Sequence, residues 1–143
     1  MNETAKSISK ATRRLGVIVN YIALAVFLVL FLAMEDHKWD WMIGTGIVLS
    51  LAVFTWTFII IHVKTGLWKF VHTRFDRLDE REAQVNYESL RYAYRIFAVV
   101  CLVIIYINAV VEKGHIHVII AASLLYLAHT LPSAVIAWKE REV

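Results

Sequence analysis

The chain has 143 residues, of which 59% are hydrophobic and 19% charged, and its formal net charge is +3. Its mean hydropathy is +0.61, which excludes an ordinary soluble domain. A single cysteine excludes a disulfide framework within the chain and any metal or cluster site that needs several cysteines. One proline and five glycines leave little room for a flexible linker.

Four long apolar stretches follow one another along the chain, at 15–34, 41–63, 93–111 and 116–138. At a rise of about 1.5 Å per residue, each spans roughly the 30 Å of a bilayer's hydrocarbon core. The stretches are continuously apolar rather than alternating, and a segment in lipid must satisfy its own backbone groups, so helices are favoured over strands. The sequence therefore predicts an all-α polytopic membrane protein whose four transmembrane helices form two hairpins.

Positive charge is concentrated on one side of this predicted topology. Of the 15 Lys and Arg residues, 13 lie at the two termini, between the second and third stretches or, in the case of Arg95, at the start of the third stretch, and only Lys38 and Lys113 lie in the other two connections. The positive-inside rule then places both termini in the cytoplasm, with an uncleaved first helix. We expect an integral protein of a bacterial inner membrane. Because topology accounts for the basic residues, nucleic acid is not an expected partner.

The long internal connection begins with an amphipathic segment at 66–78. Its apolar residues recur at spacings of four, four and three, which is typical of one helical face: Leu67, Val71, Phe75 and Leu78. Trp68 and Lys69 suit the headgroup layer of a membrane. The sequence predicts an interfacial helix over 66–78, and both lying on the membrane and packing on the bundle fit its apolar stripe.

A helix-start signal follows at once. Asp79, Glu80, Arg81 and Glu82 have the Asp-x-x-Glu spacing of a capping box. We therefore expect the third helix to cover 80–111, with a cytoplasmic extension of about three turns before the membrane. These charged residues are the expected docking surface. Catalysis there is disfavoured, because no metal-ligand or acid/base pair is implied by the spacing.

The same region carries a resemblance to other proteins. Phe-Asp-Arg-Leu-Asp-Glu-Arg-Glu at 75–82, followed by Leu-Arg-Tyr-Ala-Tyr-Arg at 90–95 before a membrane helix, resembles small uncharacterised bacterial four-helix membrane proteins. Those proteins carry an Asp-Glu-Arg motif in the cytoplasm before their third helix. The resemblance covers about the central third of the chain and implies no known activity.

Polar side chains within the apolar stretches are the first candidates for a functional site, because hydrocarbon makes them costly. Counted from the expected cytoplasmic ends, four of them lie about 8 to 14 Å deep and form one predicted intramembrane polar cluster: Asn20, Thr57, Cys101 and His129. One hypothesis is a site for a proton, an ion or a polar headgroup. We favour the other, in which a neutral His129 hydrogen-bonds to Asn20 or to a Thr hydroxyl and joins helices.

Cofactor and metal sites are weaker predictions. His62 and His72 lie near the inner surface. A haem b held by two histidines would pair His129 with His62, which lies about 12 Å shallower, so we expect no cofactor and keep haem b as an alternative. On the outer side, His37, His115 and His117 are candidate ligands for a divalent metal.

These features together predict one four-helix transmembrane domain over 1–143. We expect a non-enzymatic protein of the lipid bilayer that associates with itself or with another membrane protein, as a homo-oligomer or an accessory subunit. Small residues at Gly46 and Ser50 offer the second helix a packing face. The alternative is a redox or transport component that uses an intramembrane His129 site for haem, a proton or an ion.

Overall fold

The computed structural model describes residues 9–36, 40–111 and 116–139. All regular secondary structure in these ranges is helical, and four helices are long and apolar enough to cross a membrane. The all-helical prediction with four candidate spans is therefore confirmed. The chain divides into two compact units, Met1–Gly66 and Leu67–Val143, each described by itself below. The expectation of a single domain stays a prediction.

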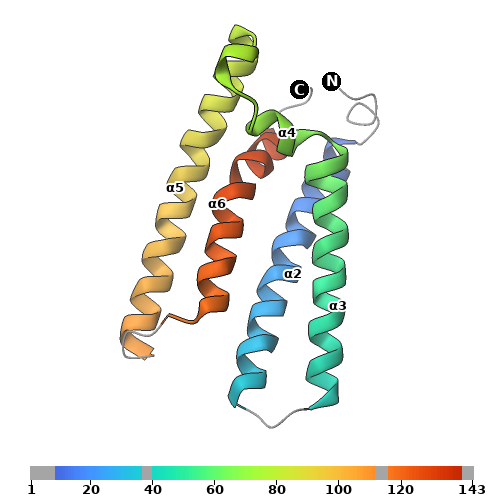
Figure 1. Ribbon diagram of the computed structural model, residues 1–143, viewed down its shortest axis with the longest axis vertical. Coiled ribbons are helices and arrows are strands. Elements are labelled where there is room, and N and C mark those ends of the chain that lie inside the picture. Colours follow the sequence, from blue (N-terminus) through green and yellow to red (C-terminus); the bar gives the residue numbers. More distant parts are fainter. Residues whose placement is uncertain (1–8, 37–39, 112–115, 140–143) are drawn as a thin grey trace. The chain divides into compact units, whose positions relative to one another are not determined.

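The first unit is a helical hairpin. Helix α2 (Lys10–Asp36) packs along α3 (Trp41–Phe58), which continues into a π-helix, η1 (Ile59–Lys64) (Figure 1). Asp40 caps α3, because its carboxylate Oδ1 accepts a hydrogen bond from the Met42 amide at 2.9 Å. Both predicted apolar stretches of this half lie within these helices, and Gly66 ends the unit at a φ of +76°.

Close packing within this hairpin depends on small residues. A Cβ atom added at Gly46 would lie 2.9 Å from Leu30 Cδ1 on α2, and one added at Gly16 would collide with the side chain of Ile61. Ser50, one turn beyond Gly46, is buried. The predicted small-residue face of α3 therefore packs against α2, as expected where apolar helices approach without large side chains between them.

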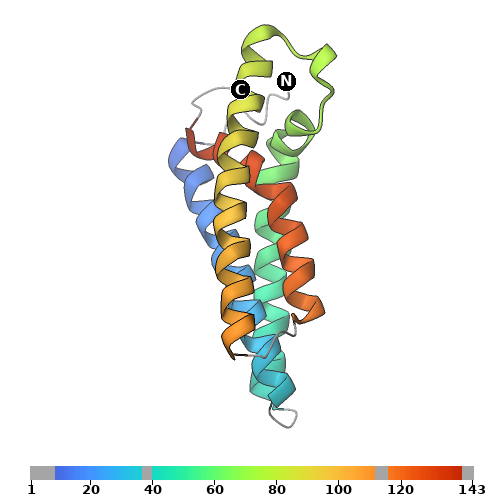
Figure 2. The same cartoon turned by 90° about the vertical axis from the view of Figure 1, so that its left-hand side faces the viewer.

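The second unit holds the longest helix and three shorter elements. They are α4 (Leu67–Val71), a 3₁₀ turn η2 (Phe75–Arg77), α5 (Glu80–Val111) and α6 (Val118–Lys139). Helices α5 and α6 pack side by side, and α4 lies against α6 (Figures 1 and 2). Figure 2 shows α6 bending in its C-terminal part, where Pro132 interrupts the helical hydrogen bonds.

The predicted continuous helix over 66–78 is wrong in its extent. The helix α4 ends at Val71, and the side chains that follow bond back to it: His72 Nδ1 lies 2.8 Å from Trp68 O, and Thr73 Oγ1 donates to Lys69 O at 2.7 Å. The Thr73 amide donates to Phe70 O at 3.2 Å, a bond of the 3₁₀ type that closes the last turn instead of continuing the α-helix. The apolar stripe is consequently split, since Leu67 is 3% exposed and Phe75 is 52% exposed.

The predicted capping box forms at the start of α5. Asp79 Oδ1 accepts from the Glu82 amide at 2.7 Å, and the Asp79 amide donates to Glu82 Oε2 at 3.2 Å. The 32 residues of α5 span about 48 Å, well beyond a hydrocarbon core of about 30 Å. All six charged residues whose side chains are described on α5 lie within 80–95, which we call the polar section of α5.

This capping box gives the first prediction. Asp79→Ala should lower the free energy of unfolding by about 0.5–2 kcal/mol and loosen the first turn of α5, whereas Asp79→Ser should retain most of the stability. Thermal melts in detergent and hydrogen exchange of the amides at 80–82 measure both effects. Asp76→Ala is the matched control, because Asp76 makes only a solvated ion pair with Arg74 at 3.2 Å. Equal losses for Asp76→Ala and Asp79→Ala would contradict the capping role.

Candidate functional site: polar and aromatic groups of the two units

Two members of the predicted polar cluster meet in the first unit. Asn20 is fully buried, and its Nδ2 donates to Thr57 Oγ1 at 2.9 Å and to Phe54 O at 3.0 Å. The Thr57 hydroxyl in turn lies 2.8 Å from Val53 O of its own helix. Asn20 therefore ties α2 to α3 through an amide that serves two acceptors, which is the interhelical contact expected of a polar group between apolar helices.

The other two members belong to the second unit. Cys101 is a half-buried free thiol on α5. His129 is exposed on α6, and its Nδ1 lies 2.8 Å from Leu125 O of the same helix. At this nitrogen, the interhelical hydrogen bond that we expected for His129 is replaced by a bond within α6.

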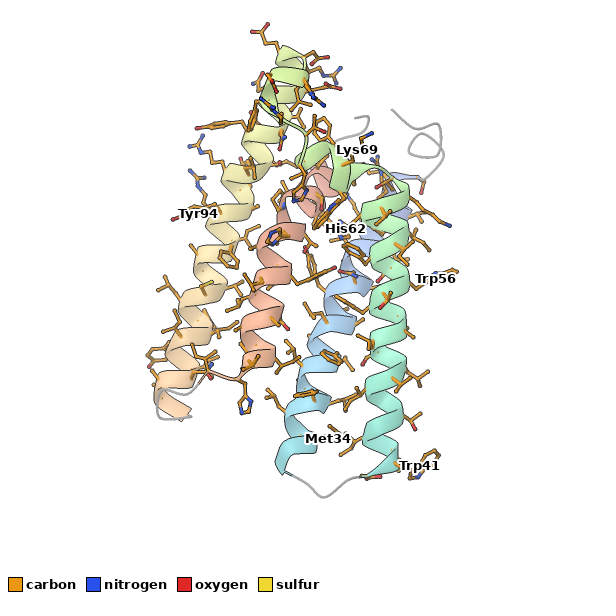
Figure 3. The ribbon with its side chains drawn as sticks, viewed as in Figure 1. Met34, Trp41, Trp56, His62, Lys69 and Tyr94 are labelled. Atoms are coloured by element: carbon orange, nitrogen blue, oxygen red, sulfur yellow. The ribbon has the colours of Figure 1, made fainter. Side chains whose placement is uncertain are left out.

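His129 instead has aromatic neighbours from α4, marked by Lys69 in Figure 3, and from the residue that follows this helix. Its imidazole ring centre lies 6.2 Å from that of His72, with an interplanar angle of 7°, and 6.4 Å from the Trp68 ring centre. Trp68 and His72 stack on each other with ring centres 4.3 Å apart. We call these three residues the aromatic cluster. It joins side chains more than fifty positions apart in the chain.

The local sequence explains how α4 contributes to this cluster. Trp68 and His72 are four residues apart, so they project from the same side of one helical turn. Leu67, beside Trp68, is almost fully buried and α4 as a whole packs on α6, which holds the turn in place. A position for Trp68 in the headgroup layer is therefore compatible with the packing of α4 on α6.

The charged residues predicted to dock a partner divide into two pairs. Asp79 and Glu82 bond to each other's amides in the capping box. Glu80 and Arg81 are exposed in the first turn of α5. The first pair thus has a structural role, and the docking role of the second stays a prediction.

The predicted outer metal site falls mostly outside the described residues. His37 and His115 lie there, and His117 is half-buried just before α6, where its carbonyl accepts from the amides of Ile120 and Ala121. Within the ranges that the structure describes, no group of three or more His, Cys, Asp or Glu side chains is arranged to hold a metal.

Sequence reasoning missed two buried amides on α5. Asn86 is fully buried and its Nδ2 reaches Val71 O at 3.4 Å, while Asn108 donates to Ile104 O at 2.8 Å. In both, the buried Oδ1 atom has no hydrogen-bond partner among the described residues. A polar amide inside an apolar run was a visible signal for Asn108. Asn86 lies in a charged segment, where nothing marks an asparagine as buried.

Comparison with known proteins adds no relative. No protein-family model, no curated protein and no solved structure matches the chain. The resemblance to small bacterial membrane proteins with an Asp-Glu-Arg motif therefore stays a prediction.

The environment of His129 gives the second prediction. Its side chain is exposed and the hydrogen bond at Nδ1 is local, so His129→Leu should change the free energy of unfolding by less than about 0.5 kcal/mol. Asn20→Leu, which removes an interhelical amide, should cost about 0.6–1.7 kcal/mol. Thermal melts of the full chain in one detergent compare the two variants. A loss for His129→Leu as large as that for Asn20→Leu would restore the interhelical role.

Proposed function

We propose that this chain is a non-enzymatic integral membrane protein that works by helix–helix association, as a homo-oligomer or as an accessory subunit of a membrane assembly. The observation that carries the proposal is an apolar face on the polar section of α5 that the chain itself leaves exposed. This tyrosine face consists of Tyr87, Leu90 and Tyr94, with exposed fractions of 64%, 37% and 73%.

A neighbouring face of the same helix, rotated by about 100°, is already used. Asn86, Ser89 and Ala93 are each less than 5% exposed, and they recur at the helical spacing of three and four residues. Tyr94 points away from α6 in Figure 3. The polar section therefore has one face that packs within the second unit and another, the tyrosine face, that is exposed and available to another molecule.

Lipid contact does not account for the whole face. Tyr94 borders the apolar half of α5 and fits the aromatic belt at a membrane surface. Tyr87 lies two helical turns further out, about 10 Å from Tyr94, among charged residues. Tyrosine and arginine are among the residue types that most often supply binding energy at protein interfaces, and the exposed Arg91 lies between the two tyrosines in the sequence.

The third prediction tests this face. The full chain should be larger than a monomer in mild detergent or cross-link to a neighbour in native membranes from a Tyr87→Cys probe in a Cys101→Ser background. The pair Tyr87→Ala and Tyr94→Ala should weaken association at least tenfold, while helicity and melting stay unchanged because both side chains are exposed. Glu88→Gln is the matched control. A chain that is monomeric in detergent and yields no cross-link from Tyr87→Cys would overturn the proposal.

Orientation is part of the proposal. Both termini and the 66–95 region are cytoplasmic, and the support is the division of 13 against 2 basic residues between the two sides. A bacterial inner membrane is the expected location.

The fourth prediction concerns this orientation. Single cysteines at Asn2, Arg77 and Val143 in a Cys101→Ser background should resist an impermeant maleimide in intact cells, and a cysteine at Asp36 should react. Permeabilised cells are the control for accessibility. Labelling at Arg77→Cys in intact cells would contradict the topology.

A second candidate function is a redox or transport component that uses His129. It is favoured by one observation: His129 lies beside His72, a second imidazole, in the aromatic cluster. Haem b, a proton and an ion are the species that this alternative allows.

A further inference from the structure

The hydrogen bonds of the two imidazoles fix where their protons are. His72 Nδ1 lies 2.8 Å from Trp68 O, and His129 Nδ1 lies 2.8 Å from Leu125 O. A carbonyl oxygen can only accept, so each Nδ1 must carry the hydrogen. In the neutral ring the other nitrogen, Nε2, then has a free lone pair.

Neither lone pair accepts a hydrogen bond from another side chain or from the backbone: among the described residues, the structure gives neither Nε2 atom a hydrogen-bond partner. Two acceptors cannot hydrogen-bond to each other, and the ring centres are only 6.2 Å apart with planes nearly parallel. A single species that uses both nitrogens at once must either donate two hydrogen bonds, as water does, or accept both lone pairs, as a metal ion does.

We propose that His72 and His129 together bind one divalent transition-metal ion such as Zn²⁺. At a Zn–N distance of about 2.0–2.1 Å, two imidazoles that lie edge to edge on one ion have ring centres about 5 to 6.5 Å apart, and the observed separation lies in that range. Metal-bound histidines almost always donate their other ring N–H to a carboxylate, a backbone carbonyl or water, and the two Nδ1–H bonds here are of this kind.

The surroundings select the kind of ion and the kind of site. Zn²⁺, Ni²⁺ and Cu²⁺ accept imidazole nitrogen, whereas Mg²⁺ and Ca²⁺ require oxygen ligands. The described residues supply no third His, Cys, Asp or Glu to this pair, and both imidazoles are exposed. Water or an added ligand therefore completes the coordination, so the ion is exchangeable rather than a permanent structural metal. Trp68 stacks on His72 and lines one side of the proposed site. Lys69 is the one charged residue of α4.

Binding would join two distant parts of the second unit. His72 follows α4, in the connection between the second and third candidate spans, and His129 lies in the fourth span. One ion on both side chains would hold that connection against α6. Since protons compete for the same nitrogens, the ion would be released as the pH falls.

The fifth prediction is a Zn²⁺ titration of the full chain in detergent. The chain carries no histidine tag, and His37, His115 and His117 are replaced by Ala, so that the outer histidines do not contribute. We expect one ion per chain at pH 7.5, binding at least tenfold weaker at pH 5.5, and no binding of Mg²⁺.

The variants test whether both histidines hold the same ion. His72→Gln and His129→Gln should each weaken binding at least tenfold, and the double variant should lose little more than either one, because the ion is already lost. With Cu²⁺, electron paramagnetic resonance should show two coupled imidazole nitrogens in the parent chain and one or none in each single variant. Circular dichroism and a monodisperse elution profile verify that each variant is folded, as expected for exposed positions.

Three results would overturn the site. They are a folded parent chain that binds no Zn²⁺, affinities unchanged in both single variants, and losses that add independently in the double variant. None of them bears on the tyrosine face of α5, whose association is measured in metal-free buffer.

Discussion

The structure depends on one constraint: a helix in hydrocarbon has to satisfy its polar groups without water. Many polar side chains of the four candidate spans do so by bonding to a carbonyl three or four residues back on their own helix. Such bonds are made by Thr45, Ser50, Thr55, Thr57, Asn108, Ser123, His129, Thr130 and Ser133. Asn20 differs, since its amide reaches across to α3.

Bonding to the same helix satisfies a hydroxyl more completely than an amide or an imidazole. A threonine needs one acceptor for its single proton, whereas asparagine and histidine each have a second polar atom that one local bond leaves over. For Asn108 this atom is the buried Oδ1, and for His129 it is Nε2. Residues with such a remaining atom are therefore the places where a membrane helix can take up a partner or a ligand.

The sequence predicted the features that depend on neighbours in the chain. The apolar runs, the Asp79–Glu82 capping box and the long third helix are all local patterns, and the structure has each of them. The prediction over 66–78 failed although the apolar spacing continues, because α4 ends at Val71 and a 3₁₀ turn follows at Phe75–Arg77.

The aromatic cluster was beyond prediction for a different reason. Depth counting treated His129 as a residue of the span alone, because helical periodicity says nothing about which residue of a distant connection packs beside it. That α4 lies on α6 depends on the burial of Leu67 and on the break after Val71. Depth counting placed His72 near the inner surface, so the sequence did not pair it with the deeper His129.

The two proposals meet in the second unit through Asn86. Its amide reaches Val71 O at the end of α4, one residue before His72, and Tyr87 of the tyrosine face is the next residue on α5. An ion on His72 and His129 would stabilise the arrangement of α4 that Asn86 contacts. If a partner on the tyrosine face prefers the same arrangement, ion and partner each strengthen the binding of the other by the same factor, because coupling between two sites is reciprocal. If the partner binds both arrangements of α4 with equal affinity, neither the ion nor the partner affects the binding of the other, however tightly each binds.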